Sequence, residues 1–251
     1  MNQNNHSNPF YTTYKSTYSS IPFDSIVIDD FEPAIMHGIN KANKEINNII
    51  NSTDKPTFEN TIERLERSGD LLSKVTDVFY NLLSVDTCNM MDDIAERISP
   101  ILTEHYNDIS LNMKLFMRVK SVYESAEGLN EEQLMLLNNC YDDFIRKGAA
   151  LDDEKKKIYR KITSDLSLLS LKFSKNKLKD LNDYYLHLTS EEQLTGLPDA
   201  IRDLAFNNAK ERGVDGWCIT LHSICYIPFM TYSSNRELRK ELYIAYNTIC
   251  T

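Results

Sequence analysis

Glycine and proline are both scarce in this sequence. Each accounts for only 7 of the 251 residues, whereas sheet-rich proteins use both to form their many turns. This scarcity argues against a β sandwich and favours long helices. Hydrophobic residues make up 41% of the chain, which is enough to bury a sizeable core in one large or two small domains.

The chain also has no excess of positive charge. It contains 28 Lys and Arg against 37 Asp and Glu, which gives a formal net charge of −9. Nucleic acids are bound through clustered cations, so this balance argues against a nucleic-acid partner. The run Lys155-Lys156-Lys157 is most simply a solvated helix face.

Cysteines are few, scattered and odd in number, which is typical of reduced thiols in a cytoplasmic protein rather than of a disulfide framework. The sequence shows no signal peptide and no apolar run long enough to span a membrane. We therefore expect a cytoplasmic location and no membrane partner. The cysteines are Cys88, Cys140, Cys218, Cys225 and Cys250.

No pair of histidines has the spacing of a zinc helix. An H-E-x-x-H motif needs two histidines four residues apart, and no such pair occurs. Glu104-His105 is only a fragment of the motif, and His222 lies near Cys218 and Cys225 at a spacing that fits no standard zinc pattern. The sequence therefore predicts no metal ligand. The histidines are His6, His37, His105, His187 and His222.

Other catalytic motifs are missing as well. There is no glycine-rich phosphate loop, no G-x-S-x-G turn and no C-x-x-C pair. Adjacent carboxylates occur at Asp92-Asp93, Glu131-Glu132 and Asp142-Asp143. Each pair is most simply a solvated face or a partner of the helix dipole. The residues alone predict no catalytic residue and identify no substrate-binding residue.

The strongest helical signal lies between Asp152 and about Asp180. Its apolar residues recur in steps of four, four, three and four, which places them on one face of a helix. Asp152 is in position to cap the N-terminus. Leu168 and Leu171 widen the apolar face, so we expect other helices of the chain to bury this helix on more than one side. The face is defined by Ile158, Ile162, Leu166, Leu169 and Phe173.

Similar periodicity predicts five earlier helices. They begin at Asp29 or Asp30, at Thr57, near Met90, near Leu115 and at Asn130. The second keeps its phase across Gly69, so we predict one helix from Thr57 to about Ser84 that can bend at the glycine. Before these helices, residues 1–28 carry aromatic residues without helical spacing and predict an extended arm held in place by its rings. The rings are Phe10, Tyr11, Tyr14, Tyr18 and Phe23.

The pattern changes after residue 180. Residues 184–188 and 217–221 are the best strand candidates. We therefore predict an all-α fold, mainly of long antiparallel helices, with at most one short two-stranded sheet. The last helix is expected to continue to the end of the chain. Two capping boxes predict further helix starts: Thr189 with Glu192, and Ser234 with Glu237.

Short motifs with a characteristic order run along nearly the whole chain. The first group is Asn8-Pro-Phe, Ile21-Pro-Phe-Asp24, Pro56-Thr-Phe-Glu-Asn-Thr-Ile62, Leu65-Glu-Arg-Ser-Gly69, Leu111-Asn112 and Lys114-Leu-Phe116. The second group is Leu166-Ser-Leu-Leu-Ser-Leu-Lys-Phe-Ser174, Gly196-Leu-Pro198, Ala209-Lys-Glu-Arg-Gly213, Trp217 to Leu221, Pro228-Phe, Tyr232-Ser, Asn235-Arg-Glu-Leu-Arg239 and Ala245-Tyr246. In this order the motifs resemble the N-terminal half of the thimet oligopeptidase and peptidyl-dipeptidase family of zinc metallopeptidases, with the dipeptidyl carboxypeptidase branch nearest.

The resemblance implies a neurolysin-like helical fold in which the N-terminal half forms one wall of a deep channel for short peptides. It implies zinc-dependent hydrolysis that removes dipeptides from the C-termini of those peptides. The family's H-E-x-x-H helix lies beyond the part that this chain resembles, so zinc is expected in a full-length enzyme and not in this chain. We therefore expect this chain alone to be inactive.

The same resemblance suggests how the chain is divided. We predict an extended aromatic arm (1–28), a helical domain (29–180) and the start of a region that joins an absent catalytic half (181–251). Segment 217–251 is rich in large apolar residues, and exposed apolar surface is unfavourable in water. Without the catalytic half, we expect this segment to self-associate, to be locally disordered or to pack in a non-native way.

Two functional hypotheses remain at this stage. In the first, the chain is the N-terminal substrate-channel wall of a peptidyl-dipeptidase and is inert by itself. In the second, it is a non-catalytic, stand-alone helical module that binds peptides or another protein. An in-frame continuation that encodes H-E-x-x-H would favour the first hypothesis, and a stop codon at this length would favour the second.

Overall fold

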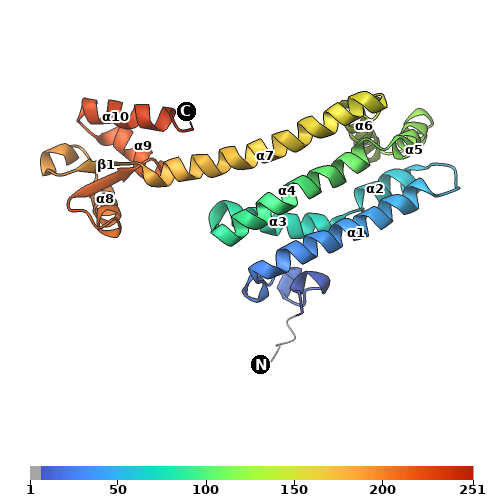
Figure 1. The fold of residues 1–251 in the computed structure, drawn as a ribbon, viewed down its shortest axis with the longest axis horizontal. Coiled ribbons are helices and arrows are strands. Elements are labelled where there is room, and N and C mark those ends of the chain that lie inside the picture. Colours follow the sequence, from blue (N-terminus) through green and yellow to red (C-terminus); the bar gives the residue numbers. More distant parts are fainter. Residues whose placement is uncertain (1–6, 251) are drawn as a thin grey trace. The chain divides into compact units, whose positions relative to one another are not determined.

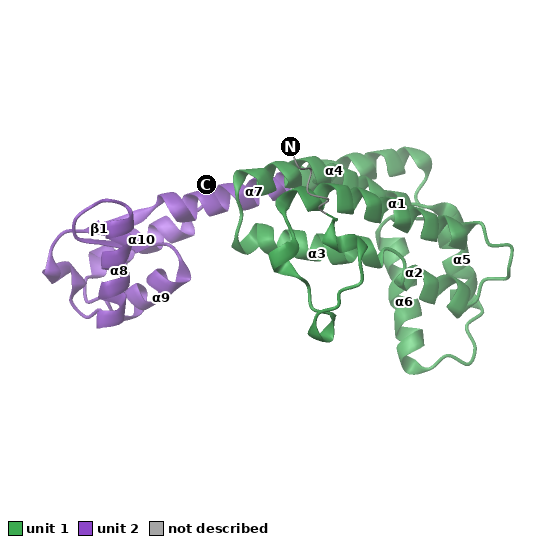
Figure 2. Ribbon diagram, turned by 90° about the horizontal axis from the view of Figure 1, so that it is seen from below, with its two compact units in different colours: residues 1–168 green, residues 169–251 purple. Residues whose placement is uncertain are grey.

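The structure is a computed structural model that describes residues 7–250, and helices dominate it (Figure 1). The chain divides into two compact units, Met1–Leu168 and Leu169–Thr251 (Figure 2). The division falls inside the long helix α7 (Asp153–Asp183), so each unit holds a part of that helix. The predicted all-α fold is confirmed.

Unit 1 is a series of helices joined by short connections. Its helices are α1 (Phe31–Ile50), α2 (Arg64–Glu66), α3 (Asp70–Val85), α4 (Asn89–Ser110), α5 (Met113–Glu124), α6 (Glu131–Arg146) and the first part of α7. Short 3-10 turns precede α1 at Pro9–Tyr11, Thr17–Ser19, Phe23–Ser25 and Ile28–Asp30, and a π-helical stretch (Phe58–Glu63) leads into α2.

Side-chain caps explain where two of these helices begin. The Asn130 carboxamide oxygen accepts a hydrogen bond from the Gln133 amide at 2.9 Å. An Asp152 carboxylate oxygen accepts one from the Lys155 amide at 2.9 Å. Each cap satisfies an amide that has no acceptor within its own helix. The predicted helix starts at Asn130 and Asp152 are therefore confirmed.

The prediction of one continuous helix across Gly69 is wrong. Gly69 has a φ angle of +80°, in the left-handed region, and the helix is interrupted there between α2 and α3. The Gly69 backbone amide donates a hydrogen bond to a carboxylate oxygen of Glu45, on α1, at 2.9 Å. Apolar phase continued across the glycine, but a single left-handed residue with its own tertiary acceptor is enough to end a helix.

Aromatic and glycine contacts hold the middle of unit 1 together. A Cβ atom on Gly38 of α1 would lie 2.9 Å from the Cα of Leu72 of α3, so a glycine is required where these helices meet. The rings of Phe31 and Phe79 lie 5.2 Å apart between centroids. Phe10, which is only 2% exposed, packs on Phe31 and anchors the segment that precedes α1. Other predicted anchors point outward: Tyr18 is 99% exposed and Phe23 is 50% exposed.

Unit 2 surrounds a two-stranded sheet. Strands β1 (Tyr185–Leu188) and β2 (Trp217–Thr220) pair antiparallel, with Leu186 opposite Ile219. The other elements are a 3-10 turn (Glu191–Leu194), α8 (Asp199–Glu211), α9 (Ser223–Tyr232) and α10 (Arg236–Asn247), together with the last part of α7. The predicted two-stranded sheet is confirmed.

Both capping boxes predicted in this region are displaced by one residue. The first is formed by Ser190 with Gln193, and the last helix is capped by Asn235, whose side chain accepts from the amides of Glu237 and Leu238. Helix α10 ends at Asn247 instead of continuing to the end of the chain. At both helix starts the residue after the predicted cap, Ser190 or Asn235, can cap as well as the predicted one, so the sequence alone could not distinguish the two positions.

Segment 217–251 contributes directly to the core of unit 2. Helix α9, which has Pro228 inside it, was not predicted. Its Phe229 is nevertheless completely buried, as are Ile219 of β2 and Leu242 of α10. Three elements of the segment therefore contribute to one apolar cluster, and local disorder or non-native packing of other parts of it stay predictions. Self-association of the segment stays a prediction.

Helix α7 departs most from its prediction. Its apolar face was expected to be buried, yet none of its residues is buried in the part of the chain that the structure describes. We call this face, Ile158, Ile162, Leu166, Leu169 and Phe173, the α7 apolar stripe. The five side chains are 59%, 58%, 60%, 62% and 57% exposed, respectively. None of the described helices has both the length and the apolar character needed to cross a membrane.

Candidate functional site

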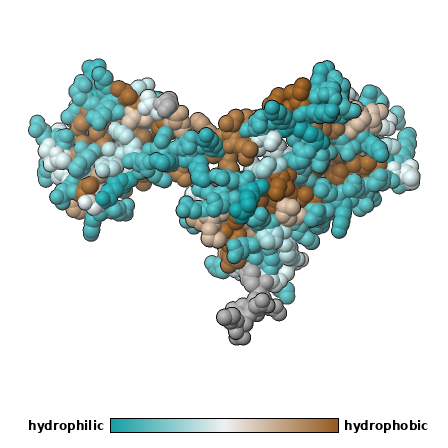
Figure 3. Space-filling model, viewed as in Figure 1, coloured by the Kyte–Doolittle hydropathy of each residue, from teal (hydrophilic) through white to brown (hydrophobic). Residues whose placement is uncertain are grey.

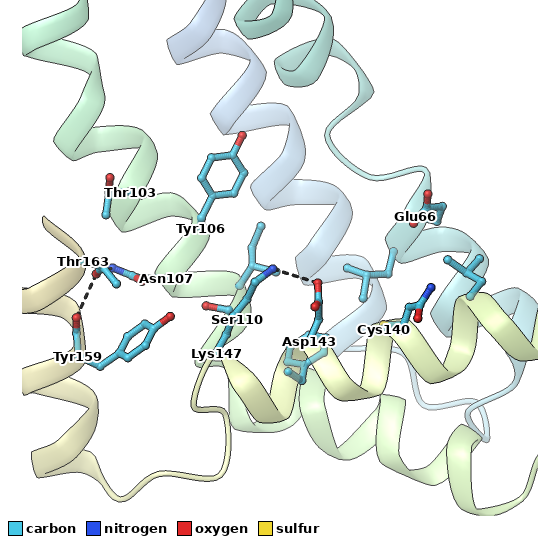
Figure 4. A pocket seen from close by; sticks show the side chains of 15 residues that line it. Glu66, Thr103, Tyr106, Asn107, Ser110, Cys140, Asp143, Lys147, Tyr159 and Thr163 are labelled. Carbon is cyan, nitrogen blue, oxygen red and sulfur yellow. Dashed lines mark hydrogen bonds and ion pairs between the residues drawn. The ribbon is translucent and has the colours of Figure 1, made fainter. Parts of the chain in front are cut away.

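A pocket within unit 1 lies between α4, α6 and the start of α7 (Figure 4). Its volume is about 500 Å³, which is in the range of small-molecule or side-chain binding sites. Its lining combines apolar, aromatic and thiol side chains with polar and charged ones, and α4, α6 and α7 all contribute polar groups. It includes Leu65, Tyr106, Ile109, Leu136, Cys140, Phe144 and Tyr159.

Asn107 and Thr163, two polar residues of the pocket wall, bond to each other. Asn107, which is 4% exposed, donates from Nδ2 to Thr163 Oγ1 at 2.9 Å. The Thr163 hydroxyl lies 3.1 Å from the Tyr159 carbonyl, as the dashed line in Figure 4 marks. The bond between Asn107 and Thr163 ties α4 to α7 within unit 1. Because these two side chains satisfy each other, this part of the wall is better suited to hold the helices together than to recognise a polar ligand.

Cys140 is the only thiol that lines this pocket among the described residues. Its pKa is raised to about 12, first by burial and then by the nearby carboxylates of Asp143 and Glu66. A thiol with that pKa is not a nucleophile near neutral pH, because the reactive form is the thiolate. Asp143 also forms an exposed ion pair with Lys147 at 3.1 Å. The pocket can therefore bind an apolar group but holds no catalytic constellation.

The side of α7 that faces α4 is polar. Lys156 Nζ donates to the Leu111 carbonyl at 2.9 Å. One turn further, Arg160 pairs with Asp108 at 2.9 Å and with Glu104. Thr163 follows with its bond to Asn107. Charged and hydroxyl groups thus fix the first half of α7 to unit 1, where an apolar face was expected.

The α7 apolar stripe points in a different direction. At 3.6 residues per turn, Ile158, Ile162 and Leu166 lie about a third of a turn round the helix from the polar contact face. Figure 3 shows hydrophobic surface over α7 between hydrophilic flanks. Leu169 and Phe173 continue the same spacing in the part of α7 that belongs to unit 2. A run of large, mostly exposed apolar side chains on one helix face marks an interaction surface.

The described histidines are separated and already have neutral partners. His105 Nδ1 lies 3.0 Å from the Asn43 carboxamide oxygen, and burial lowers its pKa. His187 Nε2 lies 2.6 Å from the Asp215 carbonyl, and His222 Nε2 lies 3.2 Å from Asn182 Oδ1. His37 stacks on Tyr11 with ring centroids 4.9 Å apart. His6 lies outside the described residues.

These positions do not fit a zinc site. Among residues 7–250, no group of three or more His, Cys, Asp or Glu side chains is arranged to hold a metal ion. Cys218 and Cys225, which lie near His222 in sequence, are both buried, and the Cys225 sulfur is within 3.4 Å of the Asn208 amide nitrogen. The pocket and the α7 apolar stripe are therefore the candidate functional features. The sequence analysis did not predict the pocket, and it identified the spacing of the stripe but not its exposure.

Comparison with known proteins finds no matching protein-family model, but it finds clear relatives. The chain is 31% identical over 241 residues to dipeptidyl carboxypeptidase of Escherichia coli and 26% identical over 243 residues to oligopeptidase A of the same organism. It is 28% identical over 234 residues to an organellar oligopeptidase A of Arabidopsis thaliana. The E. coli matches cover 95% and 96% of this chain but only 35% of each relative, so the chain spans about a third of their length.

Proposed function

We propose that this chain forms the N-terminal wall of a peptidase substrate channel. Nearly the whole chain is homologous to the N-terminal part of dipeptidyl carboxypeptidase and oligopeptidase A. The observation that carries the proposal is the uneven coverage. Nearly the whole chain matches, but it matches only 35% of the E. coli dipeptidyl carboxypeptidase. The helical architecture supports it, because a channel wall needs rigid elements more than catalytic side chains.

The reaction proposed for the complete enzyme is zinc-dependent removal of dipeptides from the C-termini of short peptides in the cytoplasm. A zinc ion in such a site activates water for attack on the peptide carbonyl. The zinc would be held by the part of the enzyme beyond the matched region, where the resemblance places the H-E-x-x-H helix. Residues of this chain would border the channel, which would admit unfolded peptides and exclude folded proteins.

A chimeric enzyme tests this proposal. Residues 1–251 would replace the matching N-terminal part of the E. coli dipeptidyl carboxypeptidase, and release of C-terminal dipeptides from a short blocked peptide would be measured. We expect the chimera to cleave the peptide, to lose activity with a chelator and to spare a folded protein. We expect the isolated chain to be inactive. Stoichiometric zinc in the isolated chain, with chelator-sensitive peptide cleavage, would contradict the proposal.

A stand-alone binding module is the second candidate. The unit 1 pocket favours it, because a largely apolar space of about 500 Å³ can accept a peptide side chain without any catalytic partner. Titration of the isolated chain with short apolar peptides, followed by calorimetry, separates the two. Micromolar binding that is lost on Leu136→Arg in the pocket, with normal folding, would favour the module over the channel wall.

A further inference from the structure

We propose that the α7 apolar stripe is the contact surface for an apolar helix face in the remaining two thirds of the peptidase polypeptide. The inference rests on the proposed function and extends it, because it names the surface through which the two parts of the enzyme meet. The stripe consists of the five residues defined above, and each of its side chains is more than half exposed.

Among the residues described for unit 1, the polar contacts that hold α7 lie on a different face of the helix from the stripe. Its Lys156, Arg160 and Thr163 are bonded to Leu111, Asp108 and Asn107, respectively. The helix is therefore attached through its polar face and exposes its apolar one. This is the reverse of a surface helix in a self-contained protein, where the apolar face packs on the core and the polar face is solvated.

The shape of the stripe fits a single helix. From Ile158 to Phe173 it extends about 22 Å at 1.5 Å per residue, or about four helical turns. Steps of four, four, three and four residues form the narrow seam on which a second helix packs. The flanks carry both signs of charge, with Lys161 and Lys172 beside Asp165, and this suits a protein surface better than an anionic lipid surface.

Length favours the rest of the polypeptide over a second copy of this chain as the occupant. A stable interface between separate proteins needs about 20–30 residues on each side, whereas the stripe supplies five. A seam this narrow can be occupied stably when the partner belongs to the same folded enzyme and makes further contacts elsewhere. The relatives have the additional polypeptide from which such a partner would come, because the chain covers only 35% of the E. coli dipeptidyl carboxypeptidase.

Hydrogen exchange tests the contact directly. The isolated 251-residue chain would be measured alone and after mixing with a polypeptide that comprises the unmatched part of the E. coli dipeptidyl carboxypeptidase. We expect association, with exchange of residues 158–173 slowed at least about tenfold in the mixture and other helices of unit 1 changed much less. No association at micromolar concentration, or protection elsewhere without protection of 158–173, would overturn the proposal.

Two leucines of the same helix provide a matched pair of variants. Leu166 belongs to the stripe and is 60% exposed, whereas Leu178 lies off it and is 40% exposed. Leu166→Ala should weaken association at least about tenfold and leave the isolated chain folded, whereas Leu178→Ala should leave association unchanged. Equal effects of the two variants would contradict the proposal. Sedimentation measures whether the isolated chain forms dimers. A dimer that dissociates in the Leu166→Ala variant would show that a second copy covers the stripe, and this would overturn the proposal.

Peptide cleavage by the mixture separates the inference from the proposed function. Cleavage without protection of 158–173 would remove only the stripe contact. Protection without cleavage would leave the contact standing and remove the channel role. The expected result is protection together with cleavage.

Discussion

Helix α7 and the segment from β2 to α10 are both rich in large apolar residues, but they use them differently. Ile219, Phe229 and Leu242 are completely buried in the unit 2 core. On α7, Ile162 and Leu166 are 58% and 60% exposed. A regular apolar spacing is therefore a sign that a helix face needs a partner, and it does not show that the partner is present in the same stretch of sequence.

The difference follows from what each region contacts nearby. Strand β2 pairs with β1, and α8, α9 and α10 contribute to the same apolar cluster as the strands, so apolar side chains close to one another in sequence also meet in space. The part of α7 in unit 1 is fixed by salt bridges and hydrogen bonds to α4 instead. Its apolar side chains have no comparable neighbours among the residues described for unit 1.

The largest expected effect comes from two phenylalanines, one on each side of this comparison. Phe229→Ala should lower the free energy of unfolding of unit 2 by about 3–5 kcal/mol, because it leaves a cavity in a packed core. Phe173→Ala, at a 57% exposed position, should change it by about 0.5 kcal/mol or less. Urea unfolding followed by fluorescence of Trp217, the single tryptophan, measures both. Equal losses would show that the stripe is as well packed as the core.

The polar attachment of α7 should have an intermediate effect. Asn107→Ala removes the donor to Thr163 at a position that is 4% exposed, and we expect a loss of about 1–3 kcal/mol in the stability of unit 1. Asn139→Ala is the control, since Asn139 lines the same pocket but is exposed. Thermal unfolding measures the difference. If both variants behave alike, the contact between Asn107 and Thr163 does not hold α7 in place.

A smaller, pH-dependent effect is expected at the joint between α1 and α4. Burial lowers the pKa of His105, and the charge of Asp108 opposes this only in part. The unfolded chain therefore binds a proton at His105 at a higher pH than the folded chain does. Stability from the neutral ring should be complete above the unfolded pKa of about 6.5 and should fall as the pH drops through the lower folded value. His105→Gln should remove this part of the pH dependence in thermal unfolding between pH 7 and 5, and an unchanged profile would assign it to other groups.

The smallest expected effect is on the stripe of the isolated chain. Ile162→Ala should change the free energy of unfolding by only about 0.5 kcal/mol, because the side chain is 58% exposed. Ile39→Ala on α1, where the side chain is 7% exposed, is the control and should cost about 2–5 kcal/mol. A loss at Ile162 as large as at Ile39 would mean that the stripe is covered in solution.

Much of the fold was predictable because local chemistry determines it. Caps such as Asn130 and Asp152 mark helix starts whatever surrounds them, and the two strands follow from their composition. The break at Gly69 depends on an acceptor from Glu45, and helix α9 depends on a core that tolerates Pro228, so neither can be read from its own segment.

The candidate site was much less predictable for the same reason. The unit 1 pocket combines residues from α4, α6 and α7, which are far apart in sequence. The stripe was visible as a pattern, but its exposure depends on the tertiary contacts of Lys156 and Arg160 on the other side of the helix. Polar residues that hold a helix in place look the same in sequence as polar residues that face solvent.

Because its pKa is raised, the Cys140 thiol can report on the opening of unit 1. With a pKa of about 12, only roughly one thiol in ten thousand is ionised at pH 8, so modification by a disulfide reagent should be very slow in the closed state. When the helices around it separate, the thiol meets water, its pKa returns toward about 8.5 and its reactivity rises by roughly three orders of magnitude. The labelling rate of Cys140 would then measure the fraction of molecules in which unit 1 is open around its pocket, under conditions in which nearly all molecules are folded.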